Sequence, residues 1–409
     1  MREDWEIKKI IEVCEVISGQ SPESKYYNKD GNGLPFFQGK KEFGEKCIGK
    51  PTTWTTKITK EAYNNDILMS VRAPVGPVNF ATQHICIGRG LAAIRPGSKL
   101  NRNFLFYYLL KNESELENTN GAVFNSINRK QIGNIPIPIP PLSEQKQIVA
   151  LLDKAFAAID QAKANIEKNI ENARELFQSK LDEVFTNEGD VWIRKKLKDV
   201  CQKTANIKWQ SNNGNYEYID LSSVSRDTLK VTDTKTISEK SAPSRAKKII
   251  HENDVIFATT RPTLKRMTII PEELSNQICS TGFVVLRSDV NQIKPEWIFY
   301  FLQTTNFMER METVQRGTSY PAVTDRDVKN CIINFPESLN NQQEMITKLN
   351  DIKDASEEMI SEYSQKIKLL EELKKSILEK AFNGELTVLN RDLQDELDVP
   401  DFGDKGKSD

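Results

Sequence analysis

Two long stretches of the chain carry the hydrophobic pattern of a helix that packs along one face. Neither 143–185 nor 340–382 contains proline or glycine, and apolar or small side chains recur at alternating steps of four and three residues. This spacing is typical of a coiled-coil seam. The seam positions are Ile148, Leu152, Ile159, Ile166 and Leu176 in the first stretch, and Leu349, Ile352, Met359, Tyr363, Leu370, Leu373 and Ile377 in the second. At about 1.5 Å per residue, each helix of about 40 residues would be roughly 60 Å long.

The region before each long helix has a different pattern, in which short β-rich runs alternate with turn residues. The runs "DILMSV" (66–71) and "GFVVLRS" (282–288) are bounded by residues that favour turns, which is typical of strands. An amphipathic helix is predicted after each of them, at about 101–112 and 294–305, with its aromatic side chains in the core. The segment "IPIPIP" (135–140) predicts an edge strand or a linker, because alternating prolines permit no helix and cannot donate a full ladder.

The whole pattern occurs twice, with a period of about 190 residues. The segment "WEIKKIIEVC" beginning at Trp5 corresponds to "WIRKKLKDVC" beginning at Trp192, and "NDILMSVRAPVG" corresponds to "NDVIFATTRPTL". In the latter pair of segments Asp66 matches Asp254. Further matches follow in the same order with small gaps, so we interpret the chain as an internal duplication.

The two matching seams favour an antiparallel pair of helices within one chain, because a long helix with one apolar face needs a partner. The alternative is a coiled coil between two copies of the chain. We therefore predict an α+β fold, in which two mixed α/β domains are separated by a long antiparallel two-helix coiled coil and related by a pseudo-twofold internal repeat. The predicted boundaries are 1–141 and 188–338 for the domains, 142–187 and 339–386 for the helices, and 387–409 for an acidic polar tail expected to be flexible.

The composition provides few groups for catalysis or metal binding. The six cysteines have no C-x-x-C spacing, which argues against a zinc ribbon or a disulfide framework, and we expect them to be small buried side chains. Only His84 and His251 are available for a histidine-based site. We find no phosphate-binding glycine loop, methyltransferase motif or nucleophile elbow, so no catalytic residue or metal ligand is predicted. Without an export signal or an apolar run of about 18 residues, we expect a cytoplasmic chain with no membrane partner.

The net charge of −1 conceals an uneven distribution. Residues 40–60 carry six lysines against two glutamates, residues 194–208 carry six basic residues against one aspartate, and the last 19 residues carry seven acids. Local charge rather than the total determines what a surface attracts. The basic parts of the two domains are therefore compatible with nucleic acid.

Polar and basic residues gather in corresponding loops of the two copies. Arg and Lys neutralise phosphates, Arg also binds guanine edges, and Asn suits adenine, although an isolated Arg after a strand is often only a surface residue or a core ion pair. The candidate DNA-binding residues are Lys40, Arg72, Arg89, Asn125, Ser126, Asn128 and Arg129 in the first copy, and Arg261, Lys265, Arg266, Arg316, Thr318, Ser319, Tyr320 and Arg326 in the second.

Nearly the whole chain, from Trp5 to about Leu386, resembles the specificity subunits of type I restriction–modification enzymes. The segments that carry the resemblance are "IPIPIPPLSEQKQIVALLDK", "SILEKAFNGELT" and the two "ND" segments above. The resemblance implies that each domain is a target-recognition domain that reads one half of a split sequence in double-stranded DNA. It also implies that the helices set the gap and dock two modification (methyltransferase) subunits, which restriction (motor and nuclease) subunits join. This chain would bind no cofactor, and S-adenosylmethionine, ATP and Mg would be bound by the partner subunits.

Two other classes of protein stay open at this point. One is a purely structural coiled-coil scaffold or adaptor, which would not show the strongly salt-dependent DNA binding that recognition requires. The other is a methyltransferase or nuclease with an unrecognised site, which would act on DNA without a partner subunit.

Overall fold

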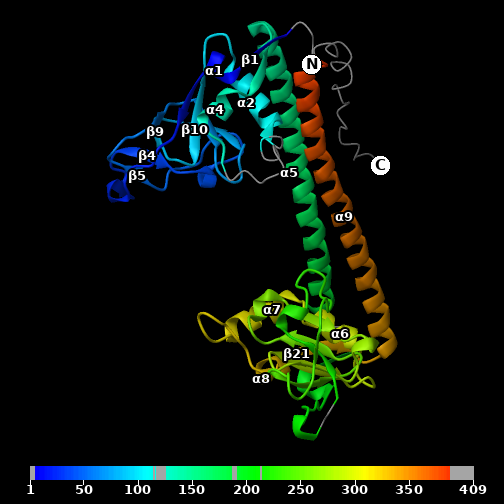
Figure 1. The fold of residues 1–409 in the computed structure, drawn as a ribbon. Coiled ribbons are helices and arrows are strands. Elements are labelled where there is room, and N and C mark those ends of the chain that lie inside the picture. The colour runs from blue at the N-terminus through cyan, green and yellow to red at the C-terminus, as the bar shows by residue number, and fades with distance from the viewer. Residues whose placement is uncertain (1–4, 114–115, 117–125, 187–190, 212–213, 387–409) are drawn as a thin grey trace, which may run out of the picture. The chain divides into compact units, whose positions relative to one another are not determined.

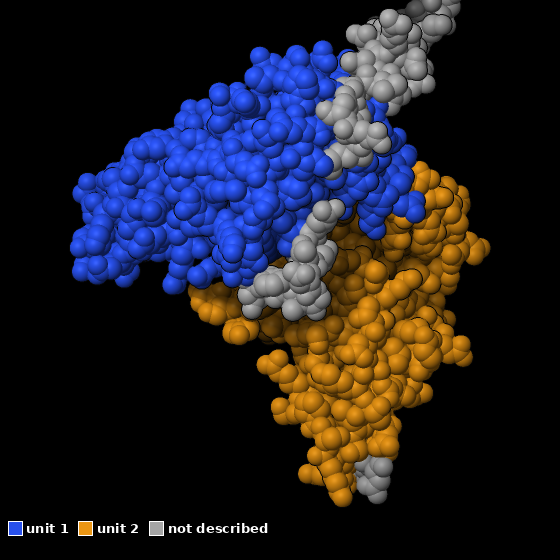
Figure 2. All heavy atoms as spheres, turned by 45° about the horizontal axis from the view of Figure 1, so that its top comes forward, with its two compact units in different colours: residues 1–166, 365–409 blue, residues 167–364 orange. Residues whose placement is uncertain are grey.

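The computed structural model describes residues 5–113, 116, 126–186, 191–211 and 214–386. The chain forms two compact units, with residues 1–166 and 365–409 in unit 1 and residues 167–364 in unit 2 (Figure 2). The long helices α5 (Leu142–Thr186) and α9 (Leu339–Asn383) each have 45 residues and contribute to both units (Figure 1). Each unit therefore combines one globular region with part of both helices. The predicted acidic tail and Asn125 lie outside the described residues.

The globular region of unit 1 contains three sheets, ordered β2-β10-β7-β8, β3-β5-β4-β9-β6 and β1-β11. The strands are β1 Glu6–Lys9, β2 Cys14–Ser18, β3 Tyr27–Asn28, β4 Leu34–Phe37, β5 Trp54–Thr55, β6 Glu61–Ala62, β7 Ile67–Ser70, β8 Val78–Phe80, β9 Ile85–Ile87, β10 Leu91–Pro96 and β11 Pro136–Ile139. The α-helices are α1 Ile10–Val13, α2 Arg102–Lys111 and α4 Arg129–Gly133, and the 3-10 helices are η1 Ser24–Tyr26 and η2 Lys40–Glu42.

The globular region of unit 2 also contains three sheets, ordered β13-β20-β17-β18, β15-β14-β19-β16 and β12-β21. The strands are β12 Trp192–Lys196, β13 Cys201–Gln202, β14 Tyr216–Ile219, β15 Lys235–Ile237, β16 Ala246–Ile250, β17 Val255–Ala258, β18 Met267–Ile269, β19 Gln277–Ser280, β20 Phe283–Ser288 and β21 Ile332–Pro336. The α-helices are α6 Pro295–Phe301, α7 Thr305–Val314 and α8 Asp325–Lys329, and the 3-10 helices are η3 Leu197–Asp199, η4 Trp209–Ser211, η5 Leu221–Ser223, η6 Pro262–Leu264 and η7 Glu272–Leu274.

One four-stranded sheet has the same strand order in both units. Strand β10 lies between β2 and β7 with both neighbours antiparallel, as β20 does between β13 and β17. Each unit also contains one parallel pair, β4 with β9 and β14 with β19. The "IPIPIP" segment forms β11, which pairs only with β1 and is therefore an edge strand, as its prolines require. The correspondence between the units is thus clear for this four-stranded sheet and for the parallel strand pair.

The predicted amphipathic helices form, but the second one is shorter than predicted. The Asn101 side chain caps α2 by accepting from the backbone N–H groups of Asn103 and Phe104, and the aromatic face of α2 is buried in the core of unit 1. In unit 2, α6 ends at Phe301, and Thr304 then caps a second helix, α7. The helix predicted at 294–305 therefore ends early, at Phe301. Helix α7 is a separate helix that the sequence did not predict, and it begins where the Thr304 side chain accepts the backbone N–H of Phe307.

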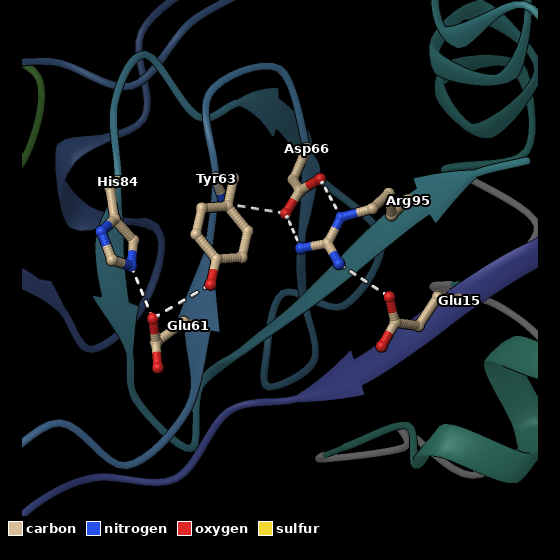
Figure 3. Close-up of polar contacts among 6 residues, drawn as sticks. All are labelled: Glu15, Glu61, Tyr63, Asp66, His84 and Arg95. Carbon is tan, nitrogen blue, oxygen red and sulfur yellow. Dashed lines mark hydrogen bonds and ion pairs between the residues drawn. The ribbon is translucent and has the colours of Figure 1, made fainter.

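Each globular region contains the same buried ion pair. In unit 1, Asp66 accepts hydrogen bonds from Arg95 Nε at 2.9 Å and Nη2 at 2.7 Å (Figure 3). In unit 2, Asp254 accepts from Arg287 Nε at 2.8 Å and Nη2 at 2.7 Å. Two parallel bonds between a guanidinium and a carboxylate are strong and directional. The pair connects the residue before β7 or β17 to the neighbouring β10 or β20, and it gives the Asp match in the sequence a structural role.

A buried glutamine joins each long helix to its globular region. The Gln145 side chain accepts from Asn101 N at 2.7 Å and donates to Lys99 O at 3.1 Å and Pro140 O at 2.8 Å. The Gln342 side chain makes the same set of three bonds, to Lys294 N at 3.0 Å, Gln292 O at 3.0 Å and Pro336 O at 2.8 Å. Both glutamines are fully buried, so each satisfies three backbone groups that water cannot reach.

The predicted seam residues differ in burial along the helices. Ile148, Leu152, Ile159 and Leu349 are buried, Ile166, Ile352, Tyr363, Leu370 and Ile377 are half-buried, and Leu176, Met359 and Leu373 are exposed. In the second half of α5 the stripe that packs into the core runs instead through Phe177, Leu181 and Phe185 at steps of four. Leu176 therefore lies beside the packed face. None of the helices in the described part of the chain combines the length and apolar composition needed to cross a bilayer.

Within unit 1 the two long helices are connected by ion pairs. Lys163 Nζ on α5 lies 3.0 Å from Glu371 Oε1 on α9, and Asp160 pairs with Lys374. The residue numbers rise on α5 as they fall on α9, so the helices run antiparallel here. Phe156 and Ile159 of α5 and Leu378 and Phe382 of α9 belong to the same hydrophobic core.

Candidate nucleic-acid interface

A cavity of about 180 Å³ in unit 1 gathers three of the predicted DNA-binding residues, Lys40, Arg72 and Arg89. A fourth long polar side chain at its wall, Gln38, was not among the sequence candidates. The other lining residues are small: Gly39, Ser70, Ala73 and Gly90. The four long side chains are exposed, and no acidic residue in the described part of the chain lines the cavity. We call this cavity the basic pocket.

The basic pocket forms where three turns meet at the ends of strands. Gln38 follows β4, and Gly90 N donates to Gln38 O at 3.0 Å, while Val71 N donates to Gly90 O at 3.0 Å. The turn 88–90 approaches so closely that a Cβ on Gly90 would lie 2.4 Å from Gln38 O, which no other residue type permits. The glycines on both sides of Arg89 therefore allow this turn to place Arg89 at the pocket.

The remaining candidates of unit 1 lie near the start of α4. Ser126 forms an isolated bridge with Arg72, and Arg129 is exposed. The Asn128 side chain accepts from the N–H groups of Lys130 and Gln131 in a capping box. The side-chain oxygen therefore caps the helix, and the side-chain NH₂ is the group that could donate to a ligand.

Unit 2 presents an arginine on an exposed tyrosine. The Arg261 guanidinium lies 4.8 Å from the centroid of the Tyr320 ring, and Tyr320 is 71% exposed. The Arg261 backbone has φ 51°, a left-handed conformation that is unfavourable for a residue with a Cβ, and Arg261 N donates to Pro321 O at 2.7 Å. Strain of this kind persists where surrounding contacts hold it and is concentrated at functional sites. The Arg261–Tyr320 pair is therefore a projecting, preorganised contact group.

One candidate of unit 2 points inward. Arg266 Nη1 donates to the carbonyl oxygens of Leu221 and Val224, each at 2.6 Å, so it stabilises the loop that contains η5. Arg316 lies 3.7 Å from Asp327, which belongs to the capping box of α8. The other candidates have exposed side chains: Lys265, Thr318, Ser319 and Arg326.

A larger cavity of about 720 Å³ in unit 1 differs from the basic pocket in its charges. It lies between α2, α5 and α9, and two of the four lysines that line it are paired with carboxylates. Lys46 Nζ lies 2.9 Å from Asp153 Oδ1, and Lys374 pairs with Asp160. The first pair connects the globular region to α5 and the second connects α5 to α9, so these charges stabilise the fold.

The basic pocket and the Arg261–Tyr320 pair give each unit an exposed cationic group of the kind that attracts nucleic acid. Three comparisons identify the class of protein. The profile of the family described as Type I restriction modification DNA specificity domain matches residues 2–172 and 190–369. The MjaIX type I restriction enzyme specificity subunit of Methanocaldococcus jannaschii is 24% identical over 94% of this chain and 94% of its own length.

A second relative is the MjaX specificity subunit of the same organism, which is 44% identical over 176 residues. That match covers 42% of this chain and 41% of the relative. A chain solved in a study of complex assembly and conformational transition of the type I R-M system has the same fold, with a TM-score of 0.74 at 18% identity over 94% of this chain and 99% of that one. The chain belongs to the type I restriction–modification DNA specificity family.

Proposed function

We propose that the chain is the specificity subunit of a type I restriction–modification complex and that each globular region reads one half of a bipartite DNA target. The observation that carries this proposal is the contrast between the two units. They share the strand order of one four-stranded sheet, a buried Asp–Arg pair and a buried glutamine that joins the long helix to the globular region (Gln145 or Gln342, called the glutamine clamp). Yet one presents the basic pocket and the other the Arg261–Tyr320 pair. One scaffold with two contact surfaces suits a reader of two different half-sites.

The helices α5 and α9 are proposed to form the antiparallel coiled coil that spaces the two readers. The ion pairs Lys163–Glu371 and Asp160–Lys374 and the shared core support this in unit 1. A helix of 45 residues is about 68 Å long. We also propose that the helices dock two modification subunits, which restriction subunits join in the cytoplasm. This chain would then bind no cofactor, with S-adenosylmethionine, ATP and Mg on the partners.

An exchange of one globular region tests the division of labour. Residues 1–140 are replaced by the corresponding segment of another family member, and the complex with its modification subunits is mapped by genome-wide methylation. We expect one block of the target to change while the other block and the gap persist. A change in both blocks would contradict one region reading one block. The control is the purified chain without modification subunits, incubated with S-adenosylmethionine and DNA. Methyl transfer in this control would show that the chain is itself an enzyme.

A further inference from the structure

We propose that the basic pocket holds one backbone phosphate of the DNA target and that unit 2 has no equivalent site. This rests on the proposed function, because it assumes that unit 1 contacts DNA. It assigns a definite ligand group to Lys40, Arg72 and Arg89, and it adds Gln38 as a neutral donor at the same place.

The charge of the pocket points to an anion. Three cationic side chains surround about 180 Å³, and none of them has an ion-pair partner among the described residues. In the larger cavity of the same unit, Lys46 and Lys374 are neutralised by Asp153 and Asp160. Cations gathered without carboxylates repel one another, and a bound phosphate removes that repulsion while accepting charge-assisted hydrogen bonds.

The shape of the pocket favours a phosphate over a base edge. Base edges lie on the floor of a groove, so side chains must project to reach them, as Arg261 on the exposed Tyr320 does. The phosphates lie along the ridges of the duplex and fit into a concave surface. The Gln38 amide can donate to a phosphate oxygen without adding charge.

The walls of the pocket are held in place by the backbone. Gly90 N donates to Gln38 O, and Gly88 N donates to Phe37 O at 2.8 Å. A Cβ on Gly88 would lie 2.9 Å from Gln38 Cα, and a Cβ on Gly90 would lie 2.4 Å from Gln38 O. The two turns are therefore fixed against each other before DNA arrives, which lowers the entropy cost of binding.

The corresponding turns of unit 2 lack the charges. Asp220 follows β14 as Gln38 follows β4, and in each unit that strand pairs in parallel with β19 or β9. Thr259 N donates to Gly282 O as Val71 N does to Gly90 O, so Thr260 corresponds to Arg72 and Thr281 to Arg89. An acid and two neutral residues thus replace an amide and two arginines. At these turns, the described residues of unit 2 therefore form no equivalent of the basic pocket.

The test uses the full chain assembled with its modification subunits and a duplex that contains the mapped target. Single phosphates of the half-site read by unit 1 are replaced in turn by neutral methylphosphonates. For the wild type we expect one position where the replacement weakens binding strongly. For the double variant R72A/R89A we expect an affinity for DNA that is about 10-fold or more lower, and a plot of log affinity against log salt whose slope is smaller by about 1. A methylphosphonate at the sensitive position should weaken the binding of this variant no further.

Lys41 provides a matched control, because it is an exposed lysine next to Lys40 on η2 but does not line the pocket. The K41A variant should keep the full methylphosphonate penalty at the wild-type position. Thermal unfolding of R72A/R89A should match the wild type, since both side chains are exposed.

Two results would refute the assignment of a phosphate to the basic pocket and leave the proposed function intact. In one, R72A/R89A keeps every methylphosphonate penalty of the wild type. In the other, its methylation map shows a changed base in the half-site of unit 1, which would mean that the pocket reads a base edge. A wild-type complex without salt-dependent target binding would instead refute the proposed function, and the pocket with it.

Discussion

The Asp66–Arg95 pair shows how a single buried charge stabilises each globular region. The Asp66 side chain is 4% exposed and that of Arg95 33%, and Arg95 also contacts Glu15, which is 58% exposed (Figure 3). The two carboxylates accept from the same guanidinium but differ in burial. Breaking a buried pair leaves a charge without compensation, whereas an exposed pair is screened by water.

We therefore expect D66N to lower the free energy of unfolding by about 3 kcal/mol and E15Q by less than about 1 kcal/mol. D254N should have an effect similar to that of D66N, because Asp254 is fully buried against Arg287. Urea unfolding of the three variants measures this. Equal losses for D66N and E15Q would show that burial of the carboxylate does not determine the strength of the pair.

The cysteines were predicted to be buried hydrophobic side chains, and four of the six are: Cys14, Cys86, Cys279 and Cys331. Cys201 is half-buried and Cys47 is exposed, contrary to the expectation for the whole set. Burial raises the pKa of the thiols of Cys14, Cys201 and Cys279 to about 12 and that of Cys331 to about 11. A raised pKa leaves almost no thiolate, the reactive form, at neutral pH.

Alkylation of the native chain by iodoacetamide at about pH 8 should therefore label Cys47 at least 10-fold faster than the other cysteines. Peptide mass spectrometry measures the labelling, and the urea-unfolded chain, in which all six should react, is the control. Even labelling of the native chain would mean that its cores open readily.

Residue by residue, the sequence predicts contact surfaces better than it predicts which side chain makes the contact. Arg72 and Arg89 do line one pocket, but Gln38 joins them from a turn far away in the sequence. Lys40, two residues away, was predicted from its charge, but nothing in the sequence marks Gln38 itself, because the pocket exists only once three turns meet. The glycines beside Arg89 were an available signal, since they are required by the close approach. Arg266 points inward because its guanidinium donates to two backbone carbonyl groups. The sequence pattern does not indicate these contacts.

At the scale of elements, the glutamine clamp couples each long helix to its globular region. Removing Gln145 or Gln342 leaves one N–H and two carbonyl groups buried without partners. We expect Q145A and Q342A each to lower the free energy of unfolding by about 3 kcal/mol. The neighbouring Gln147 is exposed, so Q147A should change the free energy of unfolding by less than about 0.5 kcal/mol.

Chemical denaturation of the three glutamine variants measures these effects. A loss for Q145A no larger than that of Q147A would show that water replaces the clamp. Fluorescence of Trp297, which lies in the core of unit 2, provides a local probe for Q342A.

The predictions for elements succeed where one periodic pattern extends over many residues and fail where a local contact decides. The 45-residue helices follow from long stretches without proline or glycine. The break between α6 and α7 depends on the hydroxyl of Thr304. The seam position Leu176 is exposed because the core of unit 2 packs instead against the face of α5 that carries Phe177 and Leu181.

At the scale of the whole molecule, the spacer hypothesis predicts that helix length sets the gap between the two blocks of the target. Deleting 165–171 together with 363–369 removes seven residues from each helix and continues the register of Lys163–Glu371. The helices shorten by about 10 Å, which is about three base pairs of DNA. Methylation mapping should show unchanged blocks with a shorter gap.

The matched control for this deletion is K168A/E171A, which alters the same stretch of α5 without changing its length and should leave the gap as it was. Altered blocks with the original gap in the deletion variant would refute the spacer hypothesis.

The composition of unit 1 has a consequence for the order in which the chain is synthesised. Its core takes Phe104 and Tyr108 from α2, which the ribosome makes early, and Phe382 from the end of α9, which packs edge-on against both rings. All of unit 2, residues 167–364, is made in between. The half of the protein that emerges first is therefore completed last. A nascent chain that stops anywhere before the end of α9 exposes the aromatic core of unit 1. Truncated products should therefore be degraded rather than persist as proteins with one working globular region.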